Sequence, residues 1–366
     1  MNPSEFFAAN YAEARRKFRD AAGAAGATVE TNRNPAAGPA DQDLGPDGLT
    51  TDVVRLGPND ARRLVVAMSA THGVEGFCGS GIQTGWLRTN LWRELPAGVG
   101  LLLIHAINPH GFAWVRRVNE DNVDLNRNFV DHSRPYPRNE GYEQLREVIC
   151  PRTWDDKTLA SGETALRAYA LKHGAMAMQG AISTGQYFDA EGVFYGGRGP
   201  VWSHRTLLDI LGRHGASAQK VAFIDLHTGL GPYGIGEIIN NHHPGAPGFD
   251  NIERWFGDEA TSSDKGSSSS AIVTGDTTNG LLRALPRADI AGITLEYGTV
   301  PLDEVLLSIR ADNWLHCHGD PRSDRGRAIK ARIRAAFYPD RDDWKRMVFE
   351  RGADVLARMA GGLAAS

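Results

Sequence analysis

The sequence has little of what marks an exported or membrane-bound protein. Cysteine occurs only three times in 366 residues, at Cys78, Cys150 and Cys317. An odd number at wide spacing gives neither a disulfide framework nor a Cys-x-x-Cys zinc motif. No apolar run approaches the roughly 20 residues that span a bilayer, and the first residues lack the basic-then-apolar order of a signal peptide. A reducing cytoplasm is therefore the expected location.

An excess of either charge is also absent. The formal net charge is −4, so the composition gives no reason to expect nucleic acid or an anionic membrane as a partner. Hydrophobic residues make up 41% of the chain and charged residues 23%, as in an ordinary globular protein with a large core. Because neither an internal repeat nor a clear linker divides the chain, we expect one domain over residues 1–366. The oligomeric state is left open.

Apolar runs alternating with amphipathic segments predict an α/β fold. Continuous apolar runs at 63–69 and 99–107 have the character of buried strands, and a predicted helix at 79–95 lies between them. Strand, helix and strand in this order form a βαβ unit, from which parallel sheets are built. Further strands are expected at 27–31, 51–56, 221–224, 236–240 and 290–296, and further helices at 4–22, 140–149, 163–179, 203–214, 301–315, 325–337 and 340–360.

A possible metal site is indicated by three side chains near strand ends. His72 and Glu75 follow a predicted strand, with a glycine after each. Imidazole and carboxylate are common zinc ligands, and glycine lets a backbone bend tightly. His227 ends another predicted strand, at the edge of an open α/β sheet where ligands bind. A His-x-x-Glu pair often arises by chance, and a lone histidine after a strand is usually structural. The interpretation therefore requires all three residues to meet.

Two further stretches carry charged groups in apolar surroundings. Residues 116–129 combine arginine and asparagine with apolar side chains of buried character, and arginine forks bind carboxylates in bidentate fashion. A solvated basic loop with surface salt bridges is the alternative interpretation. Glu296 lies inside an apolar strand. Burying its carboxylate costs free energy unless the group is paired, so an unpaired one suggests a functional role. The structural alternative there is an ion pair with a nearby arginine.

Taken in order, these motifs resemble those of the zinc carboxypeptidases. The strings are His72-x-x-Glu75, Asn108-Pro-x-Gly111, Val123-Asp-Leu-Asn-Arg-Asn-Phe129, the later His227 and the strand-borne Glu296. The Asp-Leu-His and Asp-Leu-Asn-Arg strings also resemble the related succinylglutamate desuccinylase and aspartoacylase group. The resemblance covers residues 50–320. It implies an α/β/α sandwich, with a mixed, largely parallel twisted sheet and helices on both faces.

The resemblance also implies roles for the metal site and its surroundings. His72, Glu75 and His227 would bind one Zn²⁺ and leave the fourth position for water, as a catalytic zinc requires. Glu296 would be the general base that takes the proton of the water and hands it to the leaving amine. Asp124 would orient the first zinc histidine from behind.

The substrate contacts implied by the resemblance come from the segment rich in arginine and asparagine. Arg117, with Arg116 as the less favoured candidate, would stabilise the oxyanion of the tetrahedral intermediate. Asn126 and Arg127 would grip the terminal carboxylate of the substrate. The mobile tyrosine of the family is not placed by the sequence; the candidates are Tyr195, Tyr233 and Tyr297.

The spacing of the ligands predicts an added segment. The gap between Glu75 and His227 is longer than in the simplest carboxypeptidases, so residues 130–215 are expected to be an insertion that reshapes or covers the pocket. The leading expectation is a zinc carboxypeptidase, a metallopeptidase that removes a C-terminal residue from a peptide. The alternatives are a zinc deacylase of small N-acyl amino acids and a non-catalytic binding protein on the same fold.

Overall fold

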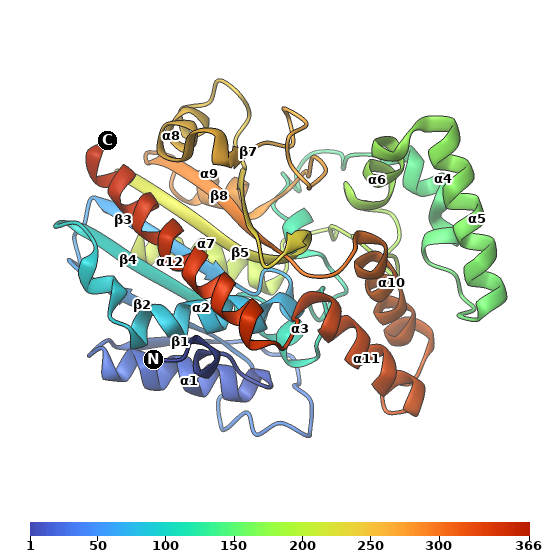
Figure 1. Ribbon diagram of the computed structural model, residues 1–366, viewed down its shortest axis with the longest axis horizontal. Helices are drawn as coiled ribbons and strands as arrows, with labels where there is room; N and C mark the ends of the chain where they lie inside the picture. The colour runs from blue at the N-terminus through green and yellow to red at the C-terminus, as the bar shows by residue number, and fades with distance from the viewer.

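One eight-stranded sheet forms the centre of the computed structural model, which describes all 366 residues (Figure 1). The strands lie in the order β1-β2-β4-β3-β5-β8-β6-β7. Their bounds are Val29–Arg33 (β1), Thr50–Leu56 (β2), Arg63–Ser69 (β3), Val99–His105 (β4), Lys220–Tyr233 (β5), Gly236–Asn240 (β6), Ala260–Thr261 (β7) and Asp289–Gly298 (β8). The inner strands β4, β3, β5 and β8 are parallel, whereas β1, β2 and β6 pair with their inner neighbours in antiparallel fashion. The predicted mixed, largely parallel sheet is confirmed.

Twelve α-helices accompany the sheet. Their bounds are Tyr11–Ala24 (α1), Gly76–Arg88 (α2), Pro109–Ala113 (α3), Glu140–Ile149 (α4), Asp156–His173 (α5), Ala175–Ser183 (α6), Trp202–His214 (α7), Pro247–Phe256 (α8), Thr277–Ala284 (α9), Leu302–His318 (α10), Asp324–Phe337 (α11) and Asp342–Ala365 (α12). None of these helices combines the length and the apolar composition required to cross a membrane. The predicted βαβ unit is β3-α2-β4, whose two strands are parallel neighbours.

Apolar side chains cover both faces of the sheet, as the continuous apolar strands predict. Successive residues of a strand point to opposite faces. On β3, Val65 and Ala67 belong to a core shared with α1, α2 and α12. Leu64, Val66 and Met68 belong to a second core shared with α7 and α9. The sheet is therefore packed between two layers of helices, which confirms the expected sandwich.

Several of the predicted helices differ from those observed. The helix expected at 79–95 is α2, which begins earlier, at Gly76, and ends at Arg88. The helix expected from residue 4 begins as α1 only at Tyr11, because the Asn10 side chain caps it by accepting a hydrogen bond from the backbone N–H of Glu13. The helix expected at 163–179 is two helices, α5 and α6, which meet at Gly174. The φ of Gly174 is +95°, a conformation that glycine adopts readily and that ends α5.

The helices α4, α5 and α6 lie beyond the edge of the layered sheet and next to α10 (Figure 1). Apolar side chains of this group form a separate cluster; Leu166 of α5 and Ile182 of α6 belong to it together with Val305 and Ile309 of α10. The segment between β4 and β5 thus builds its own packed wall on one side of the sheet.

We expect the sheet core to contribute strongly to stability. Leu103 on β4 is fully buried, so Leu103→Ala should lower the free energy of unfolding by about 2–5 kcal/mol through lost burial and a cavity. Leu171→Ala is the matched control, because Leu171 is 89% exposed and its loss should change stability by less than about 0.5 kcal/mol. Urea unfolding followed by circular dichroism measures both; equal midpoints would contradict this view of the core.

Candidate metal centre and substrate cavity

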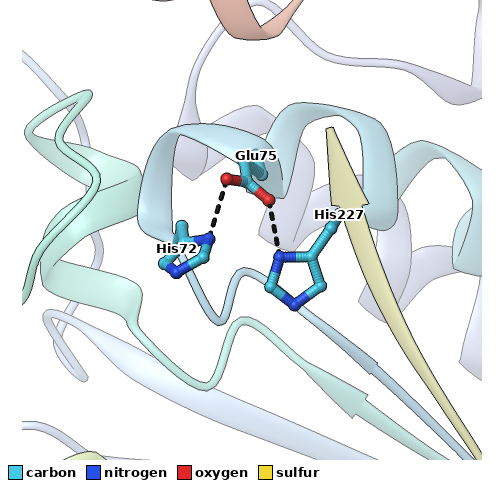
Figure 2. Close-up of side chains that lie close together, drawn as sticks. All are labelled: His72, Glu75 and His227. Atoms are coloured by element: carbon cyan, nitrogen blue, oxygen red, sulfur yellow. Dashed lines mark hydrogen bonds and ion pairs between the residues drawn. The ribbon is translucent and has the colours of Figure 1, made fainter. Parts of the chain in front are cut away.

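Three buried side chains from separate parts of the chain converge at the carboxyl ends of β3 and β5 (Figure 2). Glu75 lies between two imidazoles: its Oε1 is 2.8 Å from His72 Nδ1, and its Oε2 is 3.0 Å from His227 Nδ1. The potential ligand atoms of the three residues lie within 4.8 Å of one another. The sequence-predicted trio is therefore brought together.

The two imidazoles and the carboxylate fit a divalent metal ion. Ligand atoms bound to one zinc ion at about 2.0–2.3 Å lie no more than roughly 4 Å apart, so a small inward adjustment of these side chains is enough. Burial raises the pKa of the Glu75 carboxyl, but His72 and His227 outweigh burial and hold that pKa below its usual value. An anionic oxygen pair facing two ring nitrogens is a donor set that divalent metal ions such as zinc accept.

The loop that carries His72 and Glu75 is positioned by close backbone packing. Ala70 takes a left-handed φ of +60° and turns the chain out of β3, a conformation that is rare outside glycine and costs about 1–3 kcal/mol. A Cβ on Gly73 would lie 1.9 Å from the backbone of Gly111, at the start of α3. Gly73 therefore serves close approach rather than a special bend, because its φ is not positive.

Each histidine is held from behind by an acidic side chain. His72 Nε2 lies 3.1 Å from Asp124 Oδ1, and His227 Nε2 lies 3.0 Å from Asp225 Oδ2. The first contact is a hydrogen bond; the second has ion-pair distance without hydrogen-bond geometry. Such partners fix the ring orientation of a metal-binding histidine. Asp124 thus stands where the sequence predicted it.

Asp225 is itself fixed by two threonines. Its Oδ1 accepts a hydrogen bond from the Thr71 hydroxyl at 2.7 Å, and its Oδ2 accepts one from the Thr277 hydroxyl at 2.6 Å. The backbone N–H of Thr277 in turn donates to Asn126 Oδ1 at 3.1 Å. A continuous network therefore runs from the histidine at the metal site to the predicted substrate clamp.

Glu296 lies beside His227, since the two are register partners on the parallel strands β8 and β5. Both line the same cavity, which also includes His72 and Glu75 and has a volume of about 1180 Å³. Glu296 accepts one hydrogen bond, from the backbone N–H of Leu230 at 3.0 Å. Burial, reinforced by the negative charge of Glu75, raises the pKa of Glu296 to about 8. A cation at the metal site would offset the Glu75 charge and bring this pKa down.

Arg117 lines the cavity, and Asp124, which does not, holds it in place. Arg117 Nε donates to Asp124 Oδ2 at 3.0 Å, and its Nη1 lies 3.5 Å from Glu75 Oε1. Burial disfavours the Asp124 charge, but Arg117, Arg127 and His72 outweigh it and hold the pKa of Asp124 well below its usual value. Asp124 therefore stays an anion, and Arg117 is kept close to the metal ligands.

Asn126 and Arg127 also face the cavity. The Arg127 guanidinium donates to the carbonyl of Ser183 at the end of α6, through Nε at 3.1 Å and Nη2 at 2.5 Å, and to the Asn126 carbonyl. A guanidinium has five N–H groups, so Arg127 is fixed in place and still has donors for an anion. The ring of Phe194 lies 5.6 Å from its Cζ.

Some sequence-based candidates are not brought to this site. Arg116 does not line the cavity: its guanidinium binds Asp312 at 3.3 Å and Asn122 at 2.9 Å, on the far side of its own loop. The substrate role considered for Arg116 is therefore not supported, because these contacts direct its guanidinium away from the cavity. The cavity lining also contains none of the tyrosine candidates Tyr195, Tyr233 and Tyr297.

Sequence reasoning missed Thr71, Thr277 and Ser183. Thr277 opens α9, a helix that was not predicted. Its start was readable, however, since Asp276 precedes it as an N-cap and accepts hydrogen bonds from the N–H groups of Thr278 and Asn279. No local signal identifies Ser183, because the group that it supplies is a backbone carbonyl. The structural alternative for Glu296, an arginine partner, is not observed; the only hydrogen bond comes from a backbone N–H.

Comparison with solved structures defines the class of fold. Thrombin-activatable fibrinolysis inhibitor superposes with a TM-score of 0.51 at 11% identity, covering 98% of this chain and 74% of that one. Carboxypeptidase A from Helicoverpa armigera gives a TM-score of 0.44 at 13% identity, over 90% and 74% of the two chains. Succinylglutamate desuccinylase from Chromobacterium violaceum gives 0.38 at 15%, over 88% and 74%. Of these three, thrombin-activatable fibrinolysis inhibitor shares the fold of this chain.

The family within this class follows from the sequence itself. Residues 7–351 match the profile of the family described as "Protein of unknown function (DUF2817)", and the chain belongs to that family. None of the curated proteins compared with the chain matches it.

The metal site generates a direct prediction. Replacing His227 with Ala leaves two of three ligands, so the variant should retain well below half of the metal that the unmodified protein holds after dialysis, measured by elemental analysis. His243→Ala is the control, because His243 lines the same cavity but its side chain is 84% exposed and pairs with Asp264. Full occupancy in the His227 variant would show that the ion is held elsewhere.

Proposed function

We propose that the chain is a zinc-dependent hydrolase that cleaves an amide bond next to a free carboxylate, in the manner of a carboxypeptidase. The observation that carries this proposal is the sharing of one cavity by the His72-Glu75-His227 group, the buried Glu296 and the Arg127 guanidinium. A metal site, a proton acceptor and an anion clamp are the parts that such a reaction requires.

Each residue of the cavity has its own role in the proposed reaction. Arg127 and Asn126 bind the terminal carboxylate and so fix the scissile bond in the cavity. A zinc ion held by the three ligands would supply a Lewis acid that polarises the carbonyl and activates a water molecule. Glu296 accepts a proton from that water and delivers it to the leaving nitrogen. Arg117, beside Glu75, faces the oxyanion that develops on the carbonyl oxygen.

A non-catalytic binding protein is the least favoured alternative. Glu296 is buried, and no arginine or lysine lies within ion-pair distance of its carboxylate; a backbone N–H is its single hydrogen-bond donor. Such a carboxylate destabilises the fold. Its presence is explained if it has a role in function. Proton transfer in a reaction provides that role, and recognition alone does not.

A zinc deacylase acting on N-acyl amino acids is the second candidate. The feature that favours it is the wall built by α5, α6 and α10, which lines part of the cavity. We infer that residues 130–215 are an insertion within a single catalytic domain and that this insertion limits the size of the substrate. The three unpaired cysteines fit the cytoplasmic setting that we propose.

The proton acceptor can be tested without disturbing the metal. Glu296→Gln should lower kcat by about 10²–10⁴-fold, because the amide cannot accept the proton, while metal content stays unchanged. Glu237→Gln is the matched control: Glu237 is the register partner of Glu296 on β6 but does not line the cavity. If the Glu296 variant turned over N-blocked dipeptides at the original rate, another group would have to be the base.

The anion clamp is tested through the substrate. Arg127→Ala should raise KM for substrates with a free carboxylate by about tenfold or more, since a charge-assisted hydrogen bond is lost. KM for the amidated analogues should change much less. The ratio between the two substrates corrects for any loss of folded enzyme in the variant. Equal effects on both substrates would remove Arg127 from the clamp.

A further inference from the structure

The cavity is larger than a small acyl amino acid requires. Its volume is about 1180 Å³, whereas sites for drug-sized ligands fill about 300–1,000 Å³. The lining residues also divide by chemistry and by position. Polar side chains come from residues on or next to β6, β8 and α9, and apolar side chains come from α5, α6 and α10.

The polar side adjoins the carboxylate clamp. It contains Thr294, Asn241, Asp276 and Asn279. Thr294 precedes Glu296 by two residues on β8, so their side chains share one face of the sheet. The Thr294 hydroxyl donates to Asn241 at 3.2 Å. Thr277, next to Asp276, holds Asn126 through its backbone N–H. The amino-acid part of the substrate therefore belongs on this side.

The apolar wall begins at Gly229, in the part of β5 that follows His227. A Cβ on Gly229, two residues after His227, would lie 3.0 Å from the Phe337 ring and 3.7 Å from Val305. From there the wall continues over α5, α6 and α10. Its members are Leu166, Met178, Ile182, Val305, Leu306 and Ile309. The wall thus reaches the metal site through Gly229 and Val305. Its α6 end adjoins the clamp, where the Ser183 carbonyl binds Arg127.

The charged residues near this wall do not interrupt it. Glu163 and Arg167 on α5 are exposed and pair with each other at 3.7 Å, so they belong to the rim. Arg310 turns its guanidinium to the carbonyls of Ile149 and Val148, at 2.8 and 2.7 Å. Asp303, Glu304 and Arg332 also line the cavity, and all three are exposed, so they too belong to the rim. The buried members of the wall are apolar.

Several apolar side chains of the cavity are still in contact with solvent. Leu302, at the start of α10, is 49% exposed and Ile272 is 52% exposed, and both line the cavity. Met178 and Leu306 are half-buried members of the wall. Gln179 donates to the Ser269 carbonyl at 3.3 Å and joins α6 to the loop that carries Ile272. An apolar group lying here would cover all four side chains, and its burial would be favourable.

We propose that the acyl part of the substrate is an extended apolar group and not a small polar one such as succinyl or acetyl. This inference rests on the proposed hydrolase function and adds the chemical class of the substrate to it. Two sources carry the same chemistry: a fatty acyl chain in amide linkage to an amino acid, and a hydrophobic residue preceding the C-terminal one in a short peptide.

The test is a chain-length series. N-acetyl, N-butyryl, N-hexanoyl and N-octanoyl derivatives of alanine, glutamine and lysine are assayed with the zinc-loaded protein, beside N-acetyl-leucyl and N-acetyl-glycyl dipeptides ending in the same residues. A buried methylene contributes up to about fourfold, so kcat/KM should rise at least about tenfold from acetyl to octanoyl. A steeper response to leucine over glycine than to chain length would identify the peptide as the source.

Variants of the wall show whether the increase of kcat/KM with acyl chain length depends on this surface. Met178→Gln and Leu302→Gln together should flatten the rise with chain length to within about threefold. The matched controls are Met176→Gln and Leu171→Gln, which are 67% and 89% exposed and do not line the cavity; they should preserve the slope. Calorimetric binding of N-octanoyl and N-acetyl amino acids to Glu296→Gln protein gives a readout that does not need turnover.

The outcomes separate this inference from the function on which it rests. Hydrolysis of the acetyl or glycyl substrates with a flat or falling response to chain length would overturn the apolar subsite and leave the hydrolase intact. If kcat/KM still rose with chain length in the Met178 and Leu302 double variant, the apolar group would bind elsewhere. That result would overturn the assignment of the wall. Tight binding without hydrolysis of any substrate would overturn the proposed function but retain the subsite.

Discussion

A single buried carboxylate, that of Glu75, links the parts on which this site depends. Its two oxygens face His72, in the loop after β3, and His227, on β5 and 155 residues further along the chain. Its Oε2 also accepts a hydrogen bond from the backbone N–H of Thr228 at 3.0 Å. An anion at this depth is stable only with such partners. The parallel register of β3 and β5 brings the partners to one place.

Tight backbone packing around this carboxylate explains how a short loop can be so well defined. Gly73 packs against the backbone of Gly111, and the N–H groups of Gly73 and Val74 bind the carbonyls of Arg117 and Arg116 at 3.0 and 2.8 Å. The loop that holds two metal-site residues and the loop that holds Arg117 therefore form one unit. These backbone hydrogen bonds fix the Arg117 loop beside Glu75.

The segment between β4 and β5 connects stability with substrate choice. Its helix α6 supplies the Ser183 carbonyl that fixes Arg127, and the same helix contributes Met178 and Ile182 to the apolar wall. A change in this segment would therefore alter the anion clamp and the acyl side of the cavity together. The polar side chains of the cavity lie instead on or next to the strands β6 and β8 and the helix α9, which packs on the sheet.

The sequence alone determined the sheet class, the βαβ unit and the trio His72, Glu75 and His227, because apolar runs and strand-end motifs are local patterns. The tertiary structure decided what no local pattern encodes. In the tertiary structure, Arg116 turns away while Arg117 faces the cavity, and the Thr277 hydroxyl and the Ser183 carbonyl bind Asp225 and Arg127. The cavity is lined by polar side chains on or next to β6, β8 and α9 and by apolar side chains of α5, α6 and α10. These features depend on which distant segments meet, and that is set by the packing of whole helices on the sheet.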